Sequence, residues 1–239
     1  HSFPHDALPI WKIAESGKDG KRDQAFFEKY INEHPQVAAE VKWSANLRDA
    51  DAIVPYTNLR GAVTHTPEWR VYQDEWRRGN FGWRQTATDR TSGTIDFSVI
   101  PVRSRIDFLL YYYKKFLENG MDGIYWDNIC IYSNSNRVTS TGYIRQDGRY
   151  QPEADIWRLR ELTKRTAVLA NQLGKRNINM PHMTNAALNP VFSWTGLYYG
   201  WEWKYGKTDW QDRFSRDYIR AINIGRQAGN IPSVLEGHT

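Results

Sequence analysis

Short apolar runs alternate with longer amphipathic stretches along this sequence, and this alternation limits the fold more than any other feature. Helical spacing of apolar residues occurs in five stretches, at residues 23–33, 66–76, 101–119, 152–173 and 210–228. Strand-like apolar runs occur at residues 52–56, 94–100, 124–127, 177–182, 195–203 and 231–238. Strands that alternate with helices long enough to cross over predict a parallel sheet of right-handed βαβ units.

The number of strands leaves two versions of this fold open. A closed (β/α)8 barrel needs eight strands, whereas five or six are convincing here, and the sequence ends on a strand with no helix to cover it. We therefore expect an α/β fold that is either a (β/α)8 TIM-type barrel or a partial barrel from a larger chain. On this interpretation residues 1–239 form a single barrel-type domain, complete or cut at both ends.

Composition excludes several classes of partner. The net charge is +5, with 32 basic and 27 acidic residues intermixed, so the sequence has no basic tract typical of nucleic-acid binding. No apolar run reaches membrane-spanning length, and we expect no membrane insertion. Cys130 is the only cysteine, which rules out an internal disulfide and a zinc–thiolate site.

The aromatic content indicates a binding surface. Eleven Trp and fourteen Tyr exceed what core packing requires, and amphipathic rings gather where ligands bind. Flat rings suit the apolar faces of sugars, but they also suit nucleobases and peptides. The stripe of Trp69, Tyr72 and Trp76 is more typical of a helix face in the core.

Asp127 is the strongest candidate for a functional residue. It ends the apolar run that follows the predicted helix stop at Gly120, so it should lie at the carboxyl end of a parallel strand. Ligands and catalytic groups of βα proteins lie at that edge. The structural alternative is that Asp127 caps the next element or pairs with a nearby Arg.

Two further acids follow predicted strands, namely Glu202 and Glu236. Paired carboxylates are what glycosidic cleavage requires, one as proton donor and the other to attack, to activate water or to orient the substrate. We predict that Asp127 is the nucleophile or orienting carboxylate, Glu202 the general acid/base and Glu236 its reserve. The structural alternative for Glu202 is an ion pair with Lys204 or an Arg.

Other residues near the predicted strand ends are candidates for substrate binding. The aromatic candidates flank the acids and could desolvate them; they are Trp126, Tyr199, Trp201 and Trp203. The remaining candidates suit hydrogen bonds to ligand hydroxyls, or extend the aromatic set; they are Tyr56, Asn58, Arg60, Asn128, His182, Asn185 and His238. The long polar loop at 133–150 should help to shape the site.

Histidines offer a different chemistry. His65, His182 and His238 could form a metal site with Asp127, but no His-x-His or His-Glu-x-x-His spacing supports one. We therefore predict no metal and no cofactor, and we keep a metal-dependent hydrolase as an alternative.

Several stretches resemble a known family. Val54–Asn58, Thr66–Tyr72 and Glu75–Trp76 are similar to the catalytic barrel of large bacterial glycoside hydrolases, the family 123-like proteins of polysaccharide-degrading bacteria. Gly120–Asp127 resembles their acid-bearing fourth strand, and the resemblance covers the chain from about residue 50 onward.

The resemblance implies a substrate-assisted mechanism, in which an Asp–Glu pair orients an acetamido group and supplies the acid. Asp127 matches the Asp, but Asn128 stands where the Glu would be. Asn can orient an amide but cannot donate a catalytic proton, so Glu202 or Glu236 would have to supply the acid.

These observations together predict an enzyme, a glycosidase that cleaves a polysaccharide or glycan by carboxylate acid/base chemistry. The expected partner is a carbohydrate substrate, and the expected location is secreted or periplasmic in a bacterium. A non-catalytic carbohydrate-binding barrel is the alternative from a different class. Activity on a glycan panel separates the two.

Overall fold

The computed structural model describes residues 56–64, 66–79, 87–89, 93–118, 120–182, 188–202 and 231–235, together with residues 52, 54, 215–217 and 220. The helix expected at 23–33 lies outside these residues. Of the helix expected at 210–228, only residues 215–217 and 220 are described.

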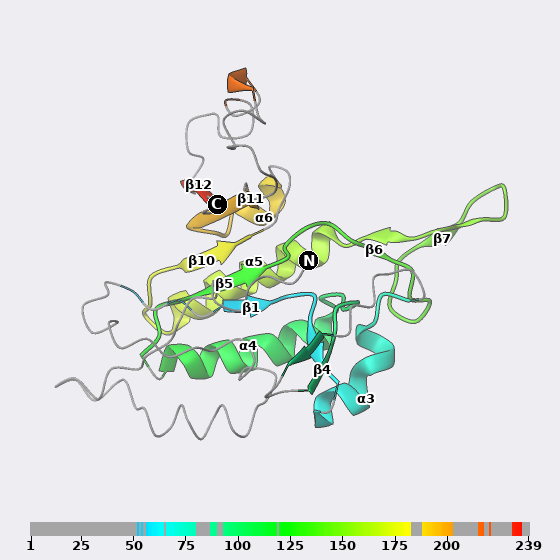
Figure 1. Ribbon diagram of the computed structural model, residues 1–239, viewed down its shortest axis with the longest axis horizontal. Helices are drawn as coiled ribbons and strands as arrows, with labels where there is room; N and C mark the ends of the chain where they lie inside the picture. Colours follow the sequence, from blue (N-terminus) through cyan, green and yellow to red (C-terminus); the bar gives the residue numbers. More distant parts are fainter. Residues whose placement is uncertain are drawn as a thin grey trace.

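A row of parallel strands forms the centre of the described structure. β5 (Gly123–Asp127) pairs in parallel with β1 (Tyr56–Asn58) on one side and β10 (Ile178–Pro181) on the other. β11 (Leu197–Glu202) and β12 (Ile231–Leu235) form a second parallel pair, and a parallel bridge between His182 and Tyr199 joins it to β10. The strands lie in chain order, β1-β5-β10-β11-β12 (Figure 1). The described strands do not close into a barrel.

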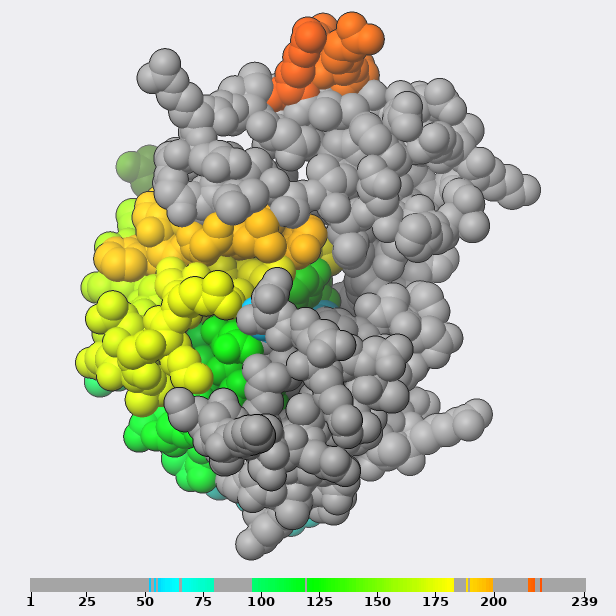
Figure 2. Space-filling model, turned by 90° about the vertical axis from the view of Figure 1, so that its left-hand side faces the viewer, coloured from blue at the N-terminus to red at the C-terminus, as the bar shows by residue number. Residues whose placement is uncertain are grey.

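The helices between these strands cover one face of the sheet. α4 (Arg103–Glu118) joins β1 to β5, α5 (Ile156–Gln172) joins β5 to β10, and the short α6 (Asn189–Phe192) precedes β11. Ile124 and Trp126 of β5 form one core cluster with apolar side chains of all three helices. Because strand residues alternate in direction, Tyr125 and Asp127 face the opposite side. In Figure 2, the segments with β5 (green), β10 (yellow) and β11 (amber) follow one another from bottom to top.

Several predicted boundaries follow from local chemistry. α3 (Pro67–Trp76) begins after Thr66, whose hydroxyl accepts from the Trp69 amide at 3.3 Å. α4 ends before Gly120, whose φ of 91° suits glycine. Trp69 and Trp76 of the predicted core stripe are buried, whereas its third member, Tyr72, is 40% exposed.

Two strand predictions were displaced. The first strand lies at Tyr56–Asn58 rather than at 52–56, in register with the end of β5. The strand expected at 94–100 is β4 (Gly93–Asp96), which pairs with β2 (Ala62–Val63) and β3 (Ala87–Asp89) in a small antiparallel sheet. β4 ends there because Asp96 Oδ1 accepts from the Ser98 amide at 2.9 Å, which turns the backbone.

The predicted polar loop after Asp127 is a β-ribbon, residues 133–154, which we call the arm. At its base β6 (Ser133–Asn134) pairs with β9 (Glu153–Ala154), and farther out β7 (Tyr143–Ile144) pairs with β8 (Tyr150–Gln151). The arm projects away from the strands (Figure 1). This pairing delays α5, which begins at Ile156 rather than at Pro152.

Candidate active site

Asp127 ends the central strand of the parallel sheet, where the sequence predicted it. Its backbone carbonyl accepts from the Leu59 amide at 3.0 Å, which holds the ends of β1 and β5 together. Its carboxylate does not open to solvent, since Asp127 is 0% exposed. It is enclosed by the side chains that it binds.

Donors from three strand ends surround the Asp127 carboxylate. Oδ1 lies 3.0 Å from Nδ1 of His182 and accepts from the Asn128 amide at 2.7 Å. Oδ2 accepts from the Tyr56 hydroxyl, from Nδ2 of Asn128 at 3.2 Å and from Nδ2 of Asn58 at 3.5 Å. Because an ionised carboxylate offers about four lone-pair sites, these contacts engage both oxygens and fix the plane of the group. We call Asp127 and these four partners the Asp127 cluster.

Three half-buried tyrosine rings lie beside the Asp127 cluster. The rings of Tyr56 and Tyr125 stack at a centroid distance of 5.6 Å, and Tyr199 lies 5.8 Å from Tyr125. His182 packs between Tyr125 at 5.4 Å and Tyr199 at 6.0 Å. Burial raises the pKa of Tyr199 above its ordinary value. The face of the sheet opposite the helices is therefore aromatic next to the carboxylate.

Tyr125 was not among the residues singled out from the sequence. The signal that could have identified it is strand alternation, because residue 125 shares a face with residue 127. By the same rule Trp126 points the other way.

Trp126 was predicted to flank the acids and bind substrate, and this prediction is wrong. Its side chain is 1% exposed and lies in the core under the helices, with its ring 6.4 Å from that of Tyr113. The helices cover the face of β5 that Trp126 occupies.

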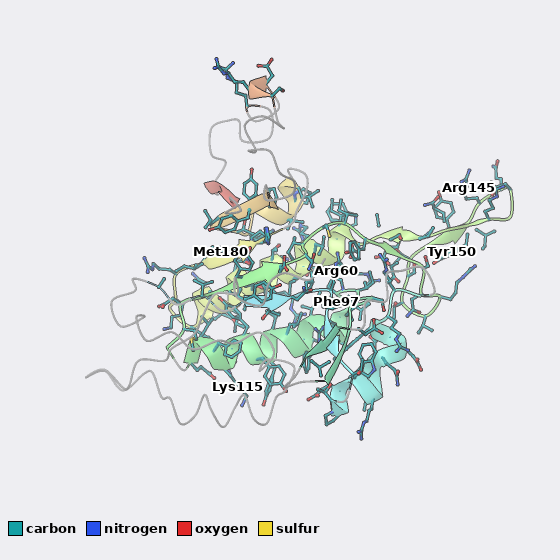
Figure 3. All side chains as sticks on the ribbon, in the orientation of Figure 1. Arg60, Phe97, Lys115, Arg145, Tyr150 and Met180 are labelled. Atoms are coloured by element: carbon teal, nitrogen blue, oxygen red, sulfur yellow. The ribbon has the colours of Figure 1, made fainter. Side chains whose placement is uncertain are left out.

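Arg60 was predicted to bind substrate, but in the structure its side chain is buried and bonds to other groups of the protein. It is 1% exposed, and Nη1 lies 2.5 Å from Oδ2 of Asp155. Its other nitrogens donate to the backbone carbonyls of Asn128, at 3.2 Å, and Cys130. Its guanidinium stacks on the Tyr132 ring at 4.2 Å. Arg60 therefore holds the segment after Asp127 in place; Figure 3 shows it in the middle of the molecule.

The structure describes some of the other predicted site residues in full, some by their backbone alone and some not at all. His182 (1% exposed) and Asn58 (8% exposed) belong to the Asp127 cluster. Trp201 and Glu202 end β11, and for these two residues only the backbone is described. The parallel bridge between His182 and Tyr199 places the end of β11 at the same edge as Asp127. The remaining predicted residues lie outside the described part of the chain; they are Asn185, Trp203, Glu236 and His238.

Two features concern metals and membranes. Within the residues that the structure describes, no group of three His, Cys, Asp or Glu could hold a metal ion; His65 and His238 lie outside them. None of the described helices is both long and apolar enough to span a bilayer.

Comparisons with known proteins find one distant likeness to report. No family model matches the chain, so the resemblance to family 123-like hydrolases is not confirmed. No curated protein matches it. Among solved structures, a cycloisomaltooligosaccharide glucanotransferase of Paenibacillus sp., in complex with cycloisomaltoheptaose, superposes with a TM-score of 0.44 and 14% identity. The match covers 77% of this chain and 26% of that one, so the chain spans about a quarter of that enzyme's length. This distant neighbour is a carbohydrate-active enzyme.

Proposed function

We propose that this chain is the catalytic domain, or part of it, of a glycoside hydrolase that acts on a polysaccharide or glycan. The Asp127 cluster beside three tyrosine rings is the observation that carries the proposal. The parallel strands with outer helices support a (β/α)8-type barrel as the surrounding fold.

Each part of this arrangement suits glycan cleavage. The cluster lies at the carboxyl edge of parallel strands, where βα enzymes bind their substrates. The rings of Tyr56, Tyr125 and Tyr199 offer flat faces to sugar C–H groups. Glu202, from the end of β11, is the proposed general acid, with Glu236 in reserve. A secreted or periplasmic location belongs to the same proposal, because an extracellular polysaccharide is too large to reach the cytoplasm intact.

One observation favours a non-catalytic carbohydrate-binding domain as the second candidate. Both oxygens of Asp127 are engaged by protein donors, and the residue is 0% exposed. A carboxylate held in this way can order a binding surface without taking part in any reaction.

The proposal is tested with a panel of neutral, acidic and N-acetylated glycans, on which the chain should release reducing ends. Asp127→Asn should lower turnover roughly 10²–10⁴-fold, the usual range for losing an acid/base group. Asp107→Asn, a change at a side chain 49% exposed on α4, should leave turnover unchanged. Thermal unfolding of each variant sets an assay temperature at which all are folded.

Two results would decide against hydrolysis. Binding to a glycan without release of reducing ends, in wild-type protein, supports the binding domain. Turnover that survives Asp127→Asn removes the Asp127 cluster from the reaction.

A further inference from the structure

We propose that the Tyr56 hydroxyl is the nucleophile of this site and that Asp127 is its general base. The inference rests on the proposed function and changes the role that the sequence predicted for Asp127. The bond to the sugar is then formed by Tyr56, which the sequence predicted only as a substrate-binding residue.

Exposure within the Asp127 cluster points to Tyr56. Asp127, His182 and Asn58 are 0%, 1% and 8% exposed. The half-buried members are Tyr56 and Asn128. A carboxamide is a poor nucleophile, whereas a phenol becomes a good one when a base takes its proton. Tyr56 is therefore the member that combines access with nucleophilic chemistry.

Hydrogen bonding within the cluster prepares Tyr56 for this role. The hydroxyl donates to Oδ2 of Asp127, and Nδ2 of Asn58 lies 3.5 Å from the hydroxyl oxygen, where it can donate to it. His182 and the Asn128 amide hold the other carboxylate oxygen, at 3.0 and 2.7 Å. Stacking on Tyr125 at 5.6 Å fixes the plane of the Tyr56 ring. The base and the nucleophile are thus in contact, and each is oriented by a third group.

The first chemical step balances as follows. The Tyr56 oxygen forms a bond to the anomeric carbon, its proton passes to Asp127, and the glycosidic C–O bond breaks. The leaving oxygen takes a proton from a carboxylic acid, for which Glu202 is the proposed donor. In the second step water attacks the anomeric carbon and gives a proton to the Glu202 carboxylate. The bond between the anomeric carbon and the Tyr56 oxygen breaks, and that oxygen takes back the proton held by Asp127. The net reaction is hydrolysis with retained configuration.

The test is covalent trapping in wild-type protein. The probes are 2,4-dinitrophenyl 2-deoxy-2-fluoroglycosides of the sugars that the protein hydrolyses, followed by peptide mapping with mass spectrometry. The expected result is one glycosyl group on Tyr56. A glycosyl group on Asp127 or on another carboxylate overturns the proposal, as does product of inverted configuration by NMR.

Variants give an independent readout. Tyr56→Phe keeps the ring but should lose both the label and at least about 10³-fold in turnover, whereas Tyr111→Phe, at a ring 55% exposed on α4, should change neither. Full turnover in Tyr56→Phe overturns the inference and leaves the glycoside hydrolase proposal standing. Wild-type protein that hydrolyses no glycan overturns both.

Discussion

At the scale of single residues, the backbone explains why Asn128 departs from the family resemblance. Asn128 stands where the resemblance expects Glu, and its φ is 59°. Asn tolerates this left-handed conformation far better than Glu does, since its short side chain bonds locally. Here that side chain reaches back to Asp127 at 3.2 Å. The position therefore serves the backbone turn and the Asp127 cluster, and not proton donation.

Arg60 gives a prediction at the same scale. Arg60→Ala should lower the free energy of unfolding by about 3–5 kcal/mol, because it leaves Asp155 charged and buried without its partner. Arg165→Ala removes an ion pair whose side chains are 39% and 49% exposed, and should cost less than about 1 kcal/mol. Urea unfolding at neutral pH measures both. Equal losses in the two variants would show that the buried pair does not hold the segment after Asp127.

At the scale of elements, β5 depends on a close approach to β10. A Cβ added at Gly123 would lie 2.2 Å from the carbonyl oxygen of Ile178 and 2.6 Å from the Cβ of Ile178. A side chain there would force apart the two strands that bring Asp127 and His182 together.

Gly123→Ala should therefore destabilise the protein by about 3 kcal/mol, as expected for overpacking against backbone. It should also weaken any activity that depends on the Asp127 cluster. Gly174→Ala is the matched control, because its Cβ meets open space and only the φ of 65° is strained; we expect a loss of about 1 kcal/mol there. Thermal and urea unfolding compare the two variants. A Gly123→Ala protein as stable as the control would mean that β5 and β10 lie farther apart.

The arm is the element whose form the sequence indicated least. The polar residues at 133–150 suggested a loop, yet Tyr150 packs over Gly142 and under the Arg137 guanidinium, which lies 3.7 Å from its ring centroid. Figure 3 shows Arg145 and Tyr150 on the projecting ribbon. These contacts explain why a stretch of low strand propensity is nevertheless paired.

For the molecule as a whole, buried tyrosines predict sensitivity to alkali. Burial, followed by the Cys130 charge and partly offset by Arg60, raises the pKa of Tyr132 from 10.0 to about 12. Burial also raises the pKa of Tyr113, Tyr198 and Tyr199. The folded protein therefore keeps protons that the unfolded chain releases near pH 10, so stability is complete below pH 10 and is lost as pH rises toward 12.

Between pH 10 and about 12 the free energy of unfolding should fall as pH rises, and Tyr132 should contribute to that slope. Unfolding free energies between pH 9 and 12, with tyrosinate absorbance followed in parallel, measure the slope. Tyr132→Phe should reduce it, and Tyr143→Phe, at a ring 63% exposed on the arm, should not. Stability that is constant over this range would contradict the predicted burial.

The sequence by itself determined the features that depend on neighbours along the chain. The start of α3 at Thr66 and Pro67, the end of α4 before Gly120 and the position of Asp127 at the end of a strand all follow from capping, glycine φ and apolar periodicity. These signals act over a few residues, so no knowledge of the fold is needed to use them.

Only the tertiary structure decided which residues meet at the candidate site. The Tyr56–Asp127, His182–Asp127 and Arg60–Asp155 contacts join residues 71, 55 and 95 positions apart. Strand alternation shows that Tyr125 and Trp126 point to opposite faces of the sheet. It does not show which face the helices cover, so the sequence-based prediction placed Trp126 on the wrong face. Side-chain burial is set by where distant elements pack, and that packing has no local signature in the sequence.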